Sequence, residues 1–323
     1  MRAIQISTAG GPDVLTPAEV PDPEPGPGEL LVEVAAAGVN YIDTYQREGI
    51  YPMPLPYVPG MEGVGRVRAV GDRVDGFAVG DRVGWAEVLG SYAELVAVPA
   101  AKAVAVPDGV SDEVAVGALL QGMTAHFLVH DAYRVQPGEH VLVHAAAGGV
   151  GLLLTQLATA CGGRVVATVS TAEKEELARA AGAADVIRYT EVDDLAAEVR
   201  ARTGGAGVAV AYDSVGRTTF DASLASLRPR GMLVLFGAAS GPVPPVDPQR
   251  LNAAGSVYLT RPKLFDYIAT REELTATAAA VLGAVAGGTL DVRIGHRYPL
   301  ADARAAHEDL QARRTTGKLV LLP

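Results

Sequence analysis

Residues 141–158 read VLVHAAAGGVGLLLTQLA, an apolar run that enters a glycine-rich turn and continues as a second apolar run. The valines of the first run predict a buried strand, and the leucines after Gly151 predict a helix. Gly148 and Gly151 have the G-x-x-G spacing, with Gly149 between them. Small residues let the backbone approach a pyrophosphate, which then faces the amides at the helix start. A tight turn without a ligand is the alternative, but the strand and helix on either side favour a bound dinucleotide.

Strand-like and helix-like segments alternate after residue 140. Further strands are expected at 164–170, 185–189, 207–216 and 231–237, and the helices between them at 172–182, 192–203 and near 217–228. Alternation at this length predicts a parallel, doubly wound α/β sheet with right-handed crossovers. A further helix is expected to begin at Ser111. Ahead of it come short valine-rich strands, at 28–40, 63–71, 81–88 and 91–99.

The end of the second strand in the alternating region decides between NADH and NADPH. Residues 167–176 read ATVSTAEKEE, with no acidic residue at the strand end, where an NADH-binding sheet grips the ribose hydroxyls. Ser170, Thr171 and Lys174 stand there instead, and two hydroxyls with an ammonium suit a 2′-phosphate. Ser170 followed by Glu173 is also a helix capping box, and both interpretations hold together. The missing carboxylate favours NADPH.

Length and composition limit the class of protein. The chain has 323 residues, which favours two domains, and its 49% hydrophobic and 20% charged residues are typical of a globular fold. A formal net charge of −10 argues against nucleic acid as a partner. Cys161 is the single cysteine, which is compatible with a reducing cytoplasm, our expected location. We expect no signal peptide and no membrane span, because glycines and polar residues interrupt the uncharged stretch 141–163.

The segment GMEGVGRV, residues 60–67, bears on metal binding. It resembles the G-H-E-x-x-G motif of zinc-dependent medium-chain alcohol dehydrogenases, with Met61 in place of the zinc-binding histidine. Asn40 falls where those enzymes have a catalytic cysteine, and one cysteine cannot build their four-cysteine lobe. A catalytic zinc needs about three protein ligands. We therefore predict no metal.

The chain resembles the zinc-lacking quinone oxidoreductase (zeta-crystallin-like) branch of the medium-chain dehydrogenase/reductase superfamily, and bacterial NADPH:quinone reductases in particular. The segments that carry the resemblance are GVNYIDTYQREGIYP (38–52), HAAAGGVGLL (144–153), YDSVGR (212–217), GSVYLTRPKL (255–264) and YIATREEL (267–274). The resemblance implies a mainly β, GroES-like catalytic domain formed by residues 1–117 and 261–323. It implies a Rossmann NADPH-binding domain at 118–260.

The resemblance also implies site residues. The catalytic set is Asn40, Tyr45, Tyr51 and Arg261. The cofactor set is Asn40, Ile42, Thr124, Gly148, Gly149, Val150, Gly151, Ser170, Thr171, Lys174, Tyr189, Ser214, Phe236, Gly237, Ala238, Arg261 and Arg313. Tyr189 and Phe236 are equally well explained as core aromatics. His144, beside the glycine loop, is expected to be a hydrogen-bonded strand residue.

The expected reaction is hydride transfer from NADPH to a quinone, with Tyr45 and Tyr51 flanking the acceptor ring and Asn40 bonding to a carbonyl. Tyr45 or water is expected to supply the proton, and full activity of Tyr45→Phe with every acceptor would refute the tyrosine. One alternative is reduction of the C=C bond of enones, alkenals or enoyl thioesters. Another is an NADPH-binding structural or RNA-binding protein. We expect a homodimer, formed through the exposed strand GSVYLTR at 255–261.

Overall fold

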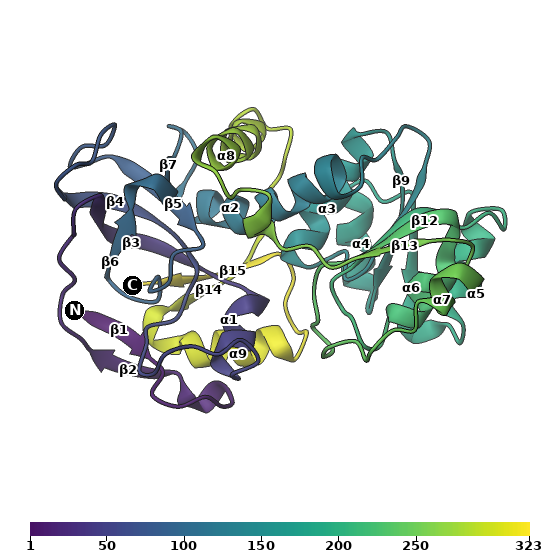
Figure 1. Cartoon of the computed structure of the whole chain (residues 1–323), viewed down its shortest axis with the longest axis horizontal. Helices are drawn as coiled ribbons and strands as arrows, with labels where there is room; N and C mark the ends of the chain where they lie inside the picture. Colours follow the sequence, from purple (N-terminus) through teal and green to yellow (C-terminus); the bar gives the residue numbers. More distant parts are fainter. The chain divides into compact units, whose positions relative to one another are not determined.

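The computed structural model describes residues 1–323 and divides them into two units (Figure 1). The first unit comprises residues 1–123 and 268–323, and the second comprises residues 124–267. Both divisions lie a few residues after the positions expected from the sequence. The first falls inside one continuous helix, α2 (Asp112–Phe127), so no turn signal marks it. The second follows Tyr267, whose ring stacks on Phe127 of the second unit at 4.3 Å.

A six-stranded parallel sheet forms the second unit. Its strands are β8 (His140–Val143), β9 (Arg164–Val169), β10 (Asp185–Arg188), β11 (Val208–Asp213), β12 (Leu227–Leu235) and β13 (Tyr258–Thr260). They lie in the order β10-β9-β8-β11-β12-β13, and every neighbouring pair is parallel. Counted from β8, this is the order 3-2-1-4-5-6 typical of dinucleotide-binding sheets. The predicted doubly wound sheet is thereby confirmed.

Helices connect the strands of this sheet. They are α3 (Gly149–Ala160), α4 (Ala172–Ala180), α5 (Leu195–Arg202), α6 (Phe220–Ser226) and α7 (Gln249–Ala253). α3 packs beside α4 and α5 beside α6. Strand residues such as Leu142, Val166 and Leu233 are completely buried, as the near-continuous apolar strands predicted. The uncharged stretch 141–163 is a strand, a turn and a helix, and no helix of the chain is long and apolar enough to cross a bilayer.

The first unit is mainly β, as expected. Its strands are β1 (Arg2–Gln5), β2 (Thr16–Glu19), β3 (Glu29–Val39), β4 (Glu62–Val70), β5 (Arg82–Ala86), β6 (Leu95–Pro99), β7 (Ala103–Ala105), β14 (Ile294–Pro299) and β15 (Lys318–Leu322). The main sheet has the order β14-β15-β3-β4-β5-β7, and β6 pairs with β3. β15 pairs antiparallel with the end of β3, which joins the two ends of the chain in one unit.

Three further helices lie in the first unit, α1 (Tyr41–Arg47), α8 (Arg271–Ala286) and α9 (Ala303–Gln311). α1 directly follows β3, and Figure 1 shows it next to α9, from the other end of the chain. Two hydrogen bonds from Arg47, to His307 and to Gln311, confirm this proximity. The core beneath them includes Trp85, which is completely buried.

Candidate active site

The carboxyl ends of the six parallel strands carry nearly all the predicted cofactor residues of the second unit. Gly148, Gly149, Val150 and Gly151 follow β8; Ser170, Thr171 and Lys174 follow β9; Tyr189 follows β10; Ser214 follows β11; Phe236, Gly237 and Ala238 follow β12; and Arg261 follows β13. Thr124, on α2, is the exception. The strand order reverses between β8 and β11, and ligands of such sheets bind at that point, beside the carboxyl ends. The fold therefore gathers at one edge residues that lie up to 113 positions apart, from 148 to 261.

The glycine loop presents free amides to this edge. Gly148 is the N-cap of α3, and the amide of Leu152 is the donor to its carbonyl at 2.9 Å. The amides of residues 149–151 come before that bond and have no acceptor within the helix. A Cβ on Gly151 would overlap Ala145 O and lie 2.8 Å from Ala146 Cα, so only glycine allows α3 to approach β8 this closely. Amides and close approach together suit a pyrophosphate.

A buried polar network holds the loops on either side of the glycine turn. The Asp213 carboxylate, at the end of β11, accepts hydrogen bonds from the amides of Val215 and Gly216, at 2.8 and 2.9 Å. It also accepts from the Ser223 hydroxyl at 2.7 Å, so the Ser223 oxygen is left to accept from His144 Nε2 at 2.9 Å. Burial lowers the pKa of His144, which is a neutral, hydrogen-bonded residue as expected, but it lies in the turn directly after β8 and not in the strand.

The corner after β9 brings the predicted 2′-phosphate residues together. Thr171 caps α4 by accepting from the Lys174 amide at 3.3 Å. The Thr190 hydroxyl donates to the Ser170 carbonyl at 3.1 Å, so the turn after β10 lies against the end of β9. Tyr189, in that turn, is 37% exposed and is not a core aromatic. The carboxylate of Glu175, on the first turn of α4, is paired with Arg179 and Arg188.

In the first unit, the carboxamide of Asn40 is hydrogen-bonded to other residues of the protein. Its carboxamide nitrogen donates to Glu62 at 2.9 Å and to the Gly38 carbonyl at 3.4 Å. Its oxygen accepts from Lys318 at 3.0 Å and from Gln121 at 3.2 Å. Every hydrogen-bonding position of the buried carboxamide is used within the protein. A hydrogen bond from Asn40 to an acceptor carbonyl would therefore require one of these contacts to break.

The other predicted residues of this unit lie on or beside α1. Tyr45 and Tyr51 contact each other edge to face, with ring centroids 5.7 Å apart. In this structure the two rings therefore pack against each other and form one aromatic surface. Ile42 is half-buried on α1, and exposed Arg313 lies near enough to oppose the burial that raises the pKa of Tyr41.

A directed chain of buried hydrogen bonds runs under α1. Arginine only donates, so Arg47 must donate to Nδ1 of His307, at 3.0 Å. Nε2 of His307 then carries the proton and donates to the Tyr92 hydroxyl at 3.1 Å, and Tyr92 donates to Asp43 at 3.0 Å. Burial raises the pKa of Asp43 to about 7, and burial with the nearby Arg47 cation lowers the pKa of His307 to about 3. Burial and the hydrogen bond from Arg47 therefore hold His307 in its neutral form in the folded protein.

His307 predicts a measurable acid sensitivity. In the unfolded chain an imidazole titrates near about 6.5, so between about pH 6.5 and 3 only the unfolded chain binds this proton. The stability that His307 contributes is present above this range and is lost as pH falls, by about 2 kcal/mol between pH 6.5 and 5. We expect the free energy of unfolding of His307→Gln, measured with urea, to fall by about 2 kcal/mol less than that of the wild type between pH 6.5 and 5.

The comparison with the variant is needed because Asp43 acts in the opposite direction. Its raised pKa means that the folded protein binds a proton as pH falls from about 7, which favours folding. Equal pH dependence of wild type and His307→Gln would show that His307 is not held neutral.

The residues at the zinc-site positions are engaged with other partners. The Gln46 amide donates to the Met61 sulfur at 3.3 Å, and Asn40 is bonded as described. The structure contains no group of three or more His, Cys, Asp or Glu side chains placed to share a metal ion.

The fold and this site define a dehydrogenase or reductase with a GroES-like domain and a dinucleotide-binding domain. A family model described as the alcohol dehydrogenase GroES-like domain matches residues 26–108, and one described as zinc-binding dehydrogenase matches residues 149–281. A quinone oxidoreductase from Pseudomonas aeruginosa is 46% identical over 324 residues, covering 100% of this chain and 99% of that protein. The chain belongs to the quinone oxidoreductase branch of the medium-chain dehydrogenase/reductase superfamily, which confirms the resemblance.

Two further similarities bear on the cofactor and the substrate. A mycobacterial protein whose structure was solved in complex with NADPH is 56% identical, with a TM-score of 0.98 and 100% of both chains covered. A 2-haloacrylate reductase from Burkholderia sp. is 42% identical over 332 residues, covering 100% of this chain and 99% of that protein.

Seven polar residues that hold the loops and helices of the two units in place carried no prediction from the sequence. They are Asp43, Glu62, Tyr92, Gln121, Asp213, His307 and Lys318. Two of them had a local signal, because Asp213 ends an apolar strand and Lys318 begins one, KLVLL. A charge in such a strand must find a buried partner. The partner of Lys318 lies 256 residues away, and no local pattern points to it.

Proposed function

We propose that the chain is an NADPH-dependent reductase that transfers hydride to quinones without a metal. The observation that carries the proposal is the set of predicted cofactor residues at the carboxyl edge of a sheet with dinucleotide-binding order. The name of the Pseudomonas relative supports a quinone as acceptor, and the mycobacterial complex supports NADPH.

NADPH fits the residues at that edge. We propose that the amides of Gly149, Val150 and Gly151, at the start of α3, bind the pyrophosphate. Ser170, Thr171 and Lys174 offer hydroxyls and an ammonium for the 2′-phosphate, and Tyr189 offers an exposed ring for the adenosine side. Ser214 and the turn Phe236-Gly237-Ala238 lie close enough that a Cβ on Gly237 would overlap the Ser214 carbonyl, so these two loops support each other.

When bound, NADPH supplies a hydride, and a quinone that takes up this hydride and one proton becomes a hydroquinone. In the first unit, Tyr45 and Tyr51 provide an aromatic surface for a flat acceptor. Tyr45 is the residue that we propose as proton donor, with water as the alternative. Asn40 anchors the start of the helix that carries Tyr45.

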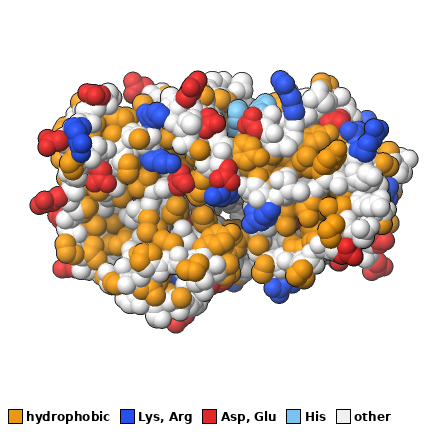
Figure 2. All heavy atoms as spheres, in the orientation of Figure 1, with side chains coloured by type: hydrophobic (Ala, Val, Ile, Leu, Met, Phe, Trp, Pro, Cys, Tyr) orange, Lys and Arg blue, Asp and Glu red, His pale blue; other side chains and the backbone are white.

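Reduction of a C=C bond is the second candidate function. The Burkholderia relative is named for an acrylate derivative, whose activated double bond accepts the same hydride at carbon. The net charge of −10 disfavours a role in RNA binding. The face drawn in Figure 2 also disfavours it, because acidic and basic side chains are interspersed there and do not form a continuous basic patch.

The decisive experiment follows the loss of NADPH absorbance with p-benzoquinone, phenanthrenequinone, trans-hexenal and a 2-haloacrylate, with NADH in parallel. Turnover of the quinones with NADPH and little with NADH supports the proposal. Preferential turnover of the enal or the haloacrylate would assign the chain to the double-bond reductases. Tight NADPH binding without turnover of any acceptor would favour a structural role.

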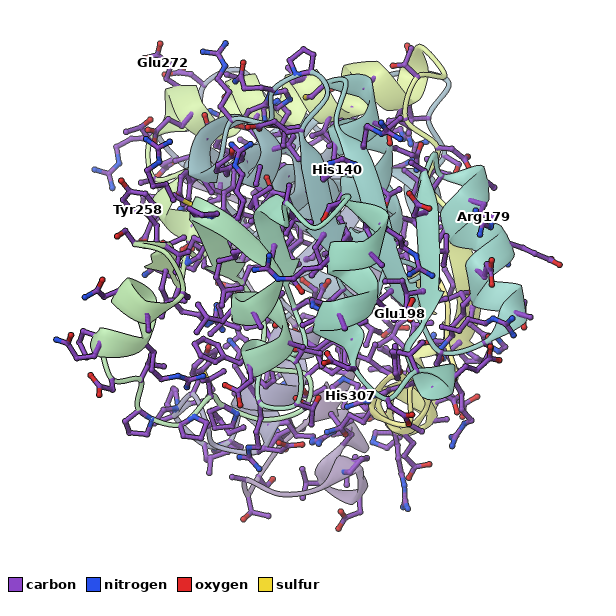
Figure 3. The ribbon with its side chains drawn as sticks, turned by 90° about the vertical axis from the view of Figure 1, so that its right-hand side faces the viewer. His140, Arg179, Glu198, Tyr258, Glu272 and His307 are labelled. Carbon is purple, nitrogen blue, oxygen red and sulfur yellow. The ribbon has the colours of Figure 1, made fainter.

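We also propose a homodimer formed through β13. This strand ends the sheet, and Tyr258 on it is 59% exposed. Tyr258 and Arg179 are labelled on opposite sides of the second unit in Figure 3, as expected for the two ends of this sheet. An unpaired edge invites pairing with a second copy. Light scattering at micromolar concentration should report a dimer for the wild type and a monomer for Tyr258→Asp, and a wild-type monomer would refute the proposal.

The reducing cytoplasm remains our proposed location, on the basis of the single cysteine, Cys161. Cell fractionation tests it directly.

A further inference from the structure

An ion pair that the proposed reaction does not use lies at the centre of the first unit. Glu62 begins β4 and Lys318 begins β15, and their side chains are 0% and 1% exposed. Removing two charges from water is so costly that apolar replacements of a buried pair are often as stable or more stable. A contribution to stability is therefore a weak explanation for this buried pair, and its contacts indicate a different role.

The pair holds the Asn40 carboxamide in one orientation. The carboxylate of Glu62 accepts from the Asn40 nitrogen at 2.9 Å, and the Lys318 ammonium donates to the Asn40 oxygen at 3.0 Å. A flipped carboxamide would direct its NH2 group at the ammonium and its oxygen at the carboxylate. Both contacts would then be repulsive, so the ion pair fixes the carboxamide by its charges as well as by packing.

The neighbouring residues are shaped around this arrangement. A Cβ on Gly38 would overlap the Glu62 carboxylate and would lie 2.7 Å from the Lys318 nitrogen. The second carboxylate oxygen of Glu62 accepts from the amide of Leu120 on α2, at 2.6 Å. Gln121, the next residue, donates to the Asn40 oxygen. Strands β3, β4 and β15 and helix α2 thus all meet at one carboxamide.

Asn40 in turn sets the start of α1. It is the N-cap residue of this helix, and its backbone amide donates to the carboxylate of Asp43 at 2.8 Å. Tyr45 lies one turn further on, and the Tyr45 carbonyl accepts from the amide of Tyr51 at 3.2 Å. Asn40 is thus joined to both tyrosines of the proposed acceptor surface through the first turn of α1 and the backbone after it, and a shift of Asn40 is expected to move them.

We propose that Glu62 and Lys318 are positioning residues, which orient Asn40 and through it the helix that presents Tyr45 to the acceptor. This inference rests on the proposed function, because it assigns a role within that reaction. It predicts that the pair affects turnover of the acceptor far more than NADPH binding, because the residues proposed for the pyrophosphate and the 2′-phosphate lie in the second unit.

The test compares Glu62→Gln, Lys318→Met and the double variant with the wild type. We expect the double variant, which leaves no unpaired charge, to fold, with a kcat lowered by about 10- to 100-fold, the loss typical of a shift of about 1 Å at a reacting group. The Kd for NADPH should stay within about twofold of the wild-type value, because the loss is expected in the step that involves the acceptor and not in cofactor binding. Emission of Trp85, the single tryptophan, reports folding of this unit, because it pairs with Gly63, next to Glu62.

The matched control is the pair Lys102 and Glu87, which are joined at 2.6 Å in the same unit and are partly exposed. The double variant Glu87→Gln/Lys102→Met makes the same chemical changes and should keep the wild-type kcat. A folded Glu62→Gln/Lys318→Met protein with wild-type kcat would overturn the proposal and leave the pair a purely structural feature.

Asn40→Ala tests the same inference without disturbing the charges. It should lower kcat about as much as the double variant, and the triple variant should lose no more, because all three changes act through one group. Wild-type kcat in Asn40→Ala would overturn the proposal even if the charge variants failed to fold. If the wild type reduces no quinone, that result counts against the proposed function alone. The kcat values of the variants and the wild type are then compared using the acceptor that the wild type does reduce.

Discussion

Gly151→Ala is expected to destabilise the protein without NADPH by about 2 kcal/mol and to weaken NADPH binding by at least about 100-fold. The added methyl group would overlap the Ala145 carbonyl oxygen and press on Ala146, and both are backbone atoms at the end of β8. Backbone cannot move aside as a side chain can, so α3 must shift away from the sheet. That shift takes the helix amides away from the pyrophosphate. Urea unfolding and a fluorescence titration with NADPH measure the two effects.

Gly148→Ala is the matched control for stability. A Cβ at Gly148 meets only the Ala145 oxygen, at 3.2 Å, and the backbone there has φ −76°, which any residue adopts. We expect the free energy of unfolding to change by less than about 1 kcal/mol. NADPH binding should still weaken, because this glycine occupies the place where the backbone approaches the pyrophosphate. Equal loss of stability in both variants would contradict the close approach described at Gly151.

Ser170→Asp is expected to lower the preference for NADPH over NADH by at least about 100-fold. The substitution places a carboxylate at the end of β9, where it repels a 2′-phosphate and accepts hydrogen bonds from a free ribose hydroxyl. Two unit charges about 4 Å apart near a protein surface interact by about 4 kcal/mol, and 100-fold in affinity needs about 2.8 kcal/mol. The ratio of kcat/KM for the two cofactors, with one acceptor, gives the result.

Ser170→Asn separates the charge from the size of the new side chain. Asparagine has the shape of aspartate without its charge, so we expect it to keep most of the preference for NADPH. Lys174→Ala should lower the preference in the same direction as Ser170→Asp, by about tenfold, because one cation is lost. An unchanged cofactor preference in Ser170→Asp would mean that the 2′-phosphate is bound elsewhere in the chain.

The elements of the second unit were predictable because they depend on neighbours in the sequence. Valine-rich runs, helical periodicity and the spacing of Gly148 and Gly151 are all local patterns, and each predicted strand of this unit is present. The prediction of NADPH over NADH also depended on a local feature, the absence of a carboxylate at the end of β9. The first unit was less predictable, because β15 pairs with β3, a strand whose paired residues lie 280 or more positions earlier in the chain, such as Val39 opposite Leu319.

By itself, the sequence determined the doubly wound sheet, the glycine loop and the residues at the carboxyl ends of its strands. Only the tertiary structure decided which groups Asn40, Tyr45 and Tyr51 contact. It enclosed Asn40 between Glu62 and Lys318 and turned the two tyrosines into one surface. The physical reason is that secondary structure follows from contacts a few residues apart. A buried charge, by contrast, is satisfied by whichever partner the packed chain brings within hydrogen-bonding distance.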